Sequence, residues 1–68
     1  MNSRFLTPRE KEIFTLLVKQ YDTEKIAKTL NITTKTVRNH ISNVIQKLGV
    51  KGRSQAILEL IKMEKLSL

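Results

Sequence analysis

The sequence has no cysteine, one proline, two glycines and few aromatic residues, which make up 4% of its 68 residues. Without cysteine the chain forms no disulfide and offers no thiolate to a metal ion, so neither can strengthen a small core. No apolar run approaches the ~18 residues of a membrane-spanning helix, and the first ten residues lack the apolar block of a signal peptide. We therefore expect a soluble cytoplasmic protein.

The short length limits the chain to one domain, residues 1–68, with a thin core. A chain near 60 residues buries only about 60% of the surface that its unfolded form exposes, which leaves little room for a deep catalytic pocket. His40 is the only histidine, and no second metal-ligating side chain stands at ligand spacing from it. We expect His40 to be a half-buried residue of a helix interface, and we expect no enzyme activity, metal, cofactor or small-molecule ligand.

Acidic residues are absent from Lys25 to Leu58, and the whole excess of positive charge lies in that segment. The net charge is +7, and outside the segment six bases balance six acids. The bases within it are Lys25, Lys28, Lys35, Arg38, Lys47, Lys51 and Arg53. Such a basic patch is typical of a protein that binds a polyanion. By charge alone, a solvated basic surface that keeps a small protein soluble remains an alternative.

Local signals divide the chain into four helices, and the first is predicted over residues 8–20. Thr7-Pro8-Arg9-Glu10 combines an N-cap hydroxyl, a proline at the first helical position and a glutamate that completes a capping box. Ile13, Leu16, Leu17 and Gln20 follow at helical spacing as the predicted buried stripe, with Phe14 beside it.

The next two helices, residues 23–30 and 34–48, are predicted to form a helix-turn-helix motif. Asp22 and Thr33 are suitable N-caps, Asn31 tolerates the left-handed backbone of a sharp turn, and Gly49 ends the second of the two helices. Ala27, Asn31 and Val37 also occupy the small, turn and apolar positions of this motif. Two ordinary packed helices remain the alternative.

The outward face of residues 34–48 carries amides, hydroxyls and bases but no acid. At 100° per residue the apolar side chains form one stripe, and the opposite face is Lys35, Asn39, Ser42, Asn43 and Gln46, with Arg38 on its shoulder. Arginine pairs with guanine and asparagine with adenine in the major groove. Hydroxyls of Thr33, Thr34 and Thr36 at the helix N-terminus suit a phosphate. Each residue alone is an ordinary solvent-facing one, but an acid-free face favours DNA.

A fourth helix, residues 53–64, carries more apolar surface than one side of a thin domain needs. Ala56, Ile57, Leu60 and Met63 form the predicted core stripe, and Leu58 and Ile61 add a second edge near Leu66 and Leu68. We expect a two-fold homodimer through this helix, with recognition helices roughly 34 Å apart. Its predicted interface is Leu58, Ile61, Lys62 and Lys65. Alternatively, the wide stripe only closes the core.

Together these motifs resemble the LuxR-type, GerE-like, helix-turn-helix DNA-binding domain over nearly the whole chain. The resemblance rests on Leu6-Thr7-Pro8-Arg9-Glu10, Ile26-Ala27, Leu30-Asn31-Ile32-Thr33, Thr36-Val37, His40, Lys47-Leu48, Arg53 and Ala56. It implies an all-α, four-helix domain, a recognition helix in the major groove and dimerisation through the last helix. The short length is similar to that of family members that control late spore-coat genes. The initial methionine favours a complete protein, although the excised end of a longer regulator would look the same.

The resemblance also implies which residues meet DNA. Its base-facing positions fall on Arg38, Asn39 and Ser42, to which the outward face adds Lys35 and Asn43. The family's contacts to the DNA backbone fall on Thr36, Lys47 and Arg53. Thr33, Thr34 and Thr23 are additional expected contacts to the DNA backbone. Lys35 is expected there as well as at the bases. Lys25 departs from the family, which often has an acid before the Ile-Ala pair.

Two hypotheses from different classes follow. The first is a sequence-specific, homodimeric transcription regulator that binds double-stranded DNA at the nucleoid. The second is a basic helical module that docks on an acidic partner such as RNA polymerase. The acid-free face favours the first, because a partner helix is normally met by an apolar groove or a surface of mixed sign; an activator on DNA could also touch polymerase. RNA binding is a weaker third hypothesis, since few aromatics are available for stacking.

Overall fold

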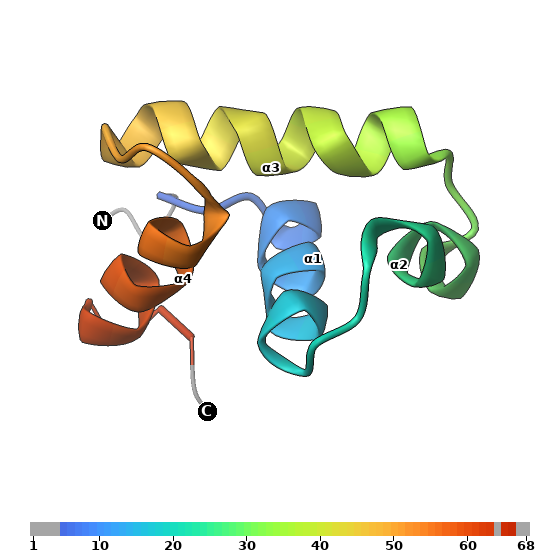
Figure 1. Ribbon diagram of the computed structural model, residues 1–68, viewed down its shortest axis with the longest axis horizontal. Coiled ribbons are helices and arrows are strands. Elements are labelled where there is room, and N and C mark those ends of the chain that lie inside the picture. The colour runs from blue at the N-terminus through green and yellow to red at the C-terminus, as the bar shows by residue number, and fades with distance from the viewer. Residues whose placement is uncertain (1–4, 64, 67–68) are drawn as a thin grey trace.

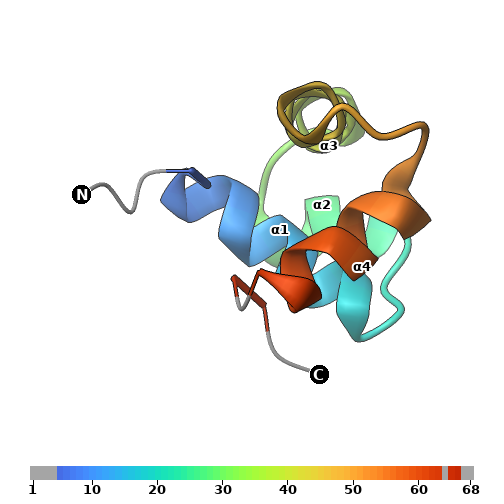
Figure 2. The ribbon, with the colours of Figure 1, turned by 90° about the vertical axis from the view of Figure 1, so that its left-hand side faces the viewer.

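The computed structural model describes residues 5–63, 65 and 66. These residues form four helices and no strand: α1 (Pro8–Val18), α2 (Thr23–Leu30), α3 (Thr34–Leu48) and α4 (Arg53–Lys62). In both views α3 lies across one side of the molecule, with the other three helices together beneath it (Figures 1 and 2). The predicted all-α fold with four helices is confirmed, and its arrangement leaves the outer face of α3 uncovered.

The predicted caps form as expected. The Thr7 hydroxyl accepts the Glu10 N–H at 3.1 Å, and the Glu10 carboxylate accepts the Thr7 N–H at 3.0 Å, which completes the capping box. Asp22 accepts the Lys25 N–H at 2.8 Å at the start of α2, and Thr33 caps α3. Each cap satisfies a backbone N–H that has no partner within its helix.

Three helices end with a residue in the left-handed conformation. Asn31 and Gly49 adopt φ values of 59° and 69°, as predicted, but Gln20 also adopts a φ of 71°. The Tyr21 N–H then donates to the Leu16 carbonyl at 3.1 Å, the long bond of a Schellman motif. The prediction that the first helix reaches residue 20 and buries Gln20 is therefore wrong. The motif ends α1 at Val18 and leaves Gln20 exposed.

All four helices contribute to one core. Its fully buried large side chains are Phe14, Ile13, Ile26, Leu60, Val37 and Val44. Phe14, predicted to flank the stripe, is thus central. Leu16, Leu30, Ile45, Leu48, Ile57 and Ile61 pack against this core and are partly buried.

The C-terminal end of the chain departs from two predictions. Met63, predicted in the core stripe, is 42% exposed, whereas Leu66, which the prediction placed only near the second apolar edge, is 8% exposed and part of the core. The Lys65 N–H donates to the Leu60 carbonyl at 2.8 Å, which turns the chain back after α4. α4 therefore ends at Lys62, before the predicted residue 64. Residue 64 and the predicted apolar Leu68 lie outside the described residues.

The helix-turn-helix prediction agrees with the structure. Ala27 and Val37 are both buried in the core, and α2 packs against α3 across the turn. The Ile32 N–H donates to the Ala27 carbonyl at 2.9 Å and closes that turn around Asn31. The N-terminal end of α3 is thus fixed by the turn, while its C-terminal half lies over α1 and α4 (Figure 1).

Candidate nucleic-acid interface

The outer face of α3 is solvent-exposed along the length of the helix. The predicted base-facing side chains Lys35, Arg38, Asn39, Ser42 and Asn43 are all exposed, as is Gln46. None of them takes part in the side-chain hydrogen bonds or ion pairs found among the described residues. Their donors and acceptors therefore face solvent rather than the protein, on a helix that projects from the molecule (Figure 2).

Hydroxyl groups gather at the N-terminal end of α3. The Thr33 hydroxyl accepts the Thr36 N–H at 3.1 Å and lies 2.9 Å from the Thr36 hydroxyl. Thr34, the first residue of α3, and Thr23, the first of α2, are both half-buried. The N-terminus of a helix carries a partial positive charge, so this end of α3 suits an anion.

Lys47 differs from the other predicted DNA contacts because its ammonium group is directed into the protein. It forms an ion pair with the Glu10 carboxylate and donates to the Phe5 carbonyl oxygen at 2.9 Å. Glu10 is only 3% exposed. The sequence reasoning recognised Glu10 as a capping residue and missed this second partner, because 37 residues separate the two along the chain and no local pattern links them.

The environment of Glu10 keeps its carboxyl group charged. Burial raises the pKa of Glu10, but the Lys47 ammonium, the Thr7 N–H and the nearby His40 together lower it below its ordinary value of 4.5. His40 is half-buried, as predicted. Within the part of the chain that the structure describes, no group of three or more histidine or acidic side chains could hold a metal ion.

Two other basic side chains lie beside the helix-turn-helix. Arg53 is exposed and begins α4, directly after the turn that follows α3. Lys25, the departure from the family pattern, is exposed on α2, and its ammonium nitrogen lies 4.2 Å from the centre of the Tyr21 ring. That distance is within the range of a cation–π interaction. Lys25 therefore adds positive charge in α2.

The predicted dimer surface lies on α4. Leu58 is 54% exposed, whereas Ile61 is partly buried against the core. Lys62 is exposed, with its ammonium 3.8 Å from the Glu59 carboxylate, and Lys65 is half-buried. Leu58 is thus the apolar residue of the predicted interface that the fold leaves uncovered.

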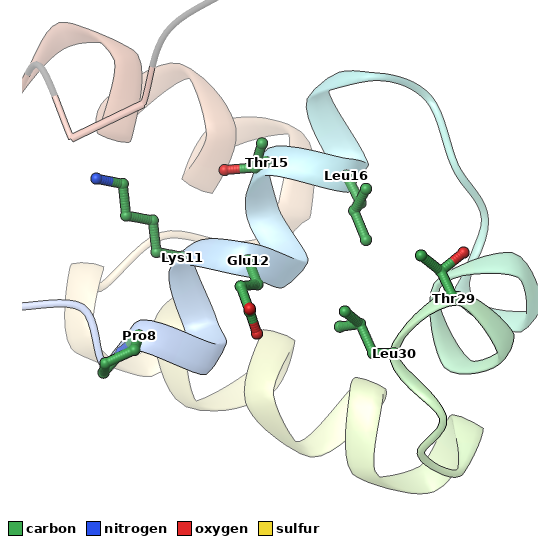
Figure 3. A pocket seen from close by; sticks show the side chains of 7 residues that line it. All are labelled: Pro8, Lys11, Glu12, Thr15, Leu16, Thr29 and Leu30. Carbon is green, nitrogen blue, oxygen red and sulfur yellow. The ribbon is translucent and has the colours of Figure 1, made fainter.

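A separate apolar groove of about 470 Å³ lies between α1 and α2, and no residue of α3 lines it. It is lined by Pro8, Lys11, Glu12, Thr15, Leu16, Thr29 and Leu30, and Leu16 and Leu30 point toward the same space (Figure 3). Its lining includes no histidine and only one carboxylate, that of Glu12, which pairs with Arg9. This arrangement lacks the convergent polar groups of a catalytic site. None of the described helices is long and apolar enough to cross a membrane.

Comparison with known families identifies the domain. Residues 4–60 match the family model described as bacterial regulatory proteins, luxR family, which includes the whole helix-turn-helix. The chain belongs to this luxR family. A solved structure titled transcription factor GerE superimposes with a TM-score of 0.91 at 65% identity, covering 93% of this chain and 94% of that one. The luxR-type fold predicted from the sequence is thereby confirmed.

Curated relatives of this luxR-family chain differ in length. It is 62% identical over 63 residues to the spore germination protein GerE of Bacillus subtilis, covering 93% of this chain and 85% of that protein. It is 46% identical over 57 residues to the transcriptional regulatory protein DegU of Brevibacillus brevis, covering 84% of this chain and 24% of that protein. The response regulator VraR of Staphylococcus aureus is 47% identical over 53 residues, covering 78% of this chain and 25% of its own length. The chain is a DNA-binding transcription regulator of the luxR family.

Proposed function

We propose that the chain is a homodimer that binds specific double-stranded DNA sequences, with α3 of each protomer in the major groove. The observation that carries the proposal is the outer face of α3, which is exposed, free of acids and without hydrogen-bond or ion-pair partners among the described residues. An α-helix fits the major groove, where each base pair presents a distinct pattern of donors and acceptors. A face whose polar groups are unpaired in the free protein can satisfy that pattern without first breaking internal bonds.

The proposed base contacts are Arg38, Asn39, Ser42, Lys35 and Asn43. Arg38 can make two hydrogen bonds to guanine, and the amides of Asn39 and Asn43 can do the same with adenine. The short Ser42 side chain allows the helix to approach the base edges closely.

The proposed phosphate contacts surround this face. They are Thr33, Thr34 and Thr36 at the start of α3, Thr23 at the start of α2, and Arg53 at the start of α4. Lys47, which the sequence also predicts as a phosphate contact, is not included among them, because Glu10 and Phe5 already accept two of its three ammonium N–H groups.

Dimerisation is proposed through α4, around the exposed Leu58, with Ile61, Lys62 and Lys65 at its border. A two-fold dimer would place two α3 helices over major grooves one helical turn apart, about 34 Å. Light scattering or sedimentation tests this interface. Leu58→Asp should convert the dimer to a monomer, whereas Met63→Asp, a change of the other exposed large apolar residue and one outside the proposed interface, should not. Equal masses for the Leu58 variant and the parent would remove Leu58 from the interface.

The cellular role that we propose is control of late sporulation or spore-coat genes, in the cytoplasm and on the nucleoid. Its support is the similarity to the spore germination protein GerE, which this chain matches over most of both lengths. In this proposal the chain is not an enzyme and needs no cofactor. Contact with RNA polymerase while bound to DNA is part of the same proposal, and docking on polymerase without sequence recognition is its alternative.

Selection of bound sites from random double-stranded DNA tests the proposal. We expect enrichment of a two-fold-related motif whose binding weakens steeply as salt rises, because phosphate contacts release counterions. Salt-sensitive binding to all sequences, without enrichment of any motif, would contradict the proposed sequence-specific binding. It would favour the alternative of a basic module that docks on an acidic partner.

A further inference from the structure

The junction between the start of α1 and the end of α3 contains a buried charge that the proposed DNA interface does not use. Glu10 is buried at this junction, although its carboxylate is charged. Leaving a charged carboxylate buried is costly unless it is paired and hydrogen-bonded. Glu10 meets both conditions through Lys47 and the Thr7 N–H.

The ammonium group of Lys47 is held by several groups of one segment. It pairs with Glu10, donates to the Phe5 carbonyl, and lies 5.9 Å from the centre of the Phe5 ring. Glu10 is itself fixed by the capping box at the start of α1. Figure 1 shows that this segment runs beneath the C-terminal half of α3. Lys47 is therefore anchored to the start of α1, where the capping box fixes Glu10.

We infer that Glu10, Lys47 and the Phe5 carbonyl form a latch that fixes the rotation of α3 about its own axis, so that Lys47 positions the recognition helix rather than contacting DNA. The inference rests on the proposed function. The hydrophobic driving force along α3 is non-directional, whereas a charged pair with a fixed acceptor defines one orientation.

The geometry of α3 connects this latch to the base-facing residues. Lys47 follows Gln46, an exposed residue of the outer face, by one position, or 100° around the helix. Two turns earlier, His40 lies on the same edge as Lys47, close enough to contribute to the lowered pKa of Glu10. At the other end the Asn31 turn holds α3 against α2. Because both ends of α3 are held, Arg38 and Asn39 point in a fixed direction from the protein. A side chain that makes two hydrogen bonds to one base requires such a fixed direction.

The decisive test compares the effects of substitutions on two quantities, the ratio of affinities for a selected duplex and a random duplex, and the slope of log affinity against log salt. Glu10→Gln keeps a capping side chain, because glutamine also serves in a capping box, and removes only the charge. Lys47→Met keeps the aliphatic stem. Arg53→Gln is the matched control, an exposed proposed phosphate contact whose side chain has no hydrogen-bond or ion-pair partner in the described part of the chain.

We expect Glu10→Gln and Lys47→Met each to lower the affinity ratio by about tenfold, the order of one two-bond base contact, with the salt slope unchanged. Arg53→Gln should leave the ratio unchanged and reduce the slope by about 0.9. The double variant Glu10→Gln/Lys47→Met buries no unpaired charge and remains measurable if a single variant unfolds. The double variant should lower the ratio of affinities for the selected and random duplexes by about the same factor as either single variant.

Three results would overturn the latch. A slope reduced by about 0.9 in Lys47→Met with no effect of Glu10→Gln would make Lys47 a phosphate contact. A lower melting temperature with an unchanged ratio would make the pair structural only. Amide hydrogen exchange judges the latch without DNA: Glu10→Gln should accelerate exchange in the last turns of α3 more than in α2, and uniform acceleration would contradict it. If the parent protein shows no sequence preference, the proposed function fails. The amide hydrogen exchange of Glu10→Gln then tests the latch by itself.

Discussion

Two parts of α3 carry similar side chains and have opposite surroundings. The outer face, with Arg38 at its shoulder, is exposed and its polar groups have no partner among the described residues, whereas Lys47 near the C-terminal end is paired with the buried Glu10. On a helical wheel both cations lie at the border of the same polar face. The difference shows that the neighbouring elements, rather than position on the helix, decide which charge is free to meet DNA.

The largest expected effect lies at the paired cation. Removing one partner of a buried ion pair costs about 3–5 kcal/mol, and because a third of the Lys47 side chain is exposed (33%), we expect Lys47→Met to lower the free energy of unfolding by about 2–3 kcal/mol. Lys35→Met, on the outer face, should change it by no more than about 0.5 kcal/mol. Urea unfolding measures the free energy of unfolding of both variants. Equal losses in the two variants would contradict the difference between the two parts of α3.

Arg38 provides the next effect, on DNA binding rather than on stability. Arg38→Ala should cost about 1–3 kcal/mol on a selected site and relax its sequence preference, while folding stays unaffected because the side chain is exposed. Fluorescence anisotropy with selected and random duplexes of equal length measures the preference. Lys19→Ala, an exposed cation just beyond α1, is the control. An equal loss on both duplexes would remove Arg38 from the base contacts.

The smallest effect is the dependence of stability on pH. Because the pKa of Glu10 in the folded protein lies below its ordinary value of 4.5, its charged form stabilises the fold fully above that value. This stabilisation is lost as the pH falls through the lower, folded pKa. Between about pH 5 and pH 3, Glu10→Gln should therefore lose less stability than the parent. Glu12→Gln, at an exposed pair with Arg9, should follow the parent, and identical curves for all three proteins would contradict the assignment.

The features that the sequence predicted correctly are those with local signals. The capping box at Thr7, the turn at Asn31 and the helix end at Gly49 each depend on residues within five positions of one another, and all three form. The prediction that the first helix includes Gln20 is wrong because glutamine rarely adopts a left-handed conformation, and no neighbouring residue signals the end of α1. Met63 is exposed and Leu66 joins the core because the chain turns back after α4, and no local pattern predicts that turn.

The candidate site shows the same division. The exposed face of α3 follows from helical periodicity, and each of its predicted base-facing residues is exposed. The pairing of Lys47 with Glu10 depends on how α1 crosses α3, which periodicity within a single helix does not specify. An acid in the first turn of one helix and a base at the border of another were both visible, but only the fold brings them together.

The central claim is that the outer face of α3 reads DNA sequence, and the side-chain amides of Asn39 and Asn43 report on it directly. Their ¹H–¹⁵N signals can be compared in the free protein, with a selected duplex and with a random duplex of equal length. The account predicts that both signals shift with the selected duplex and shift much less with the random one. Unchanged amide signals, with the shifts concentrated instead along the groove between α1 and α2, would contradict it.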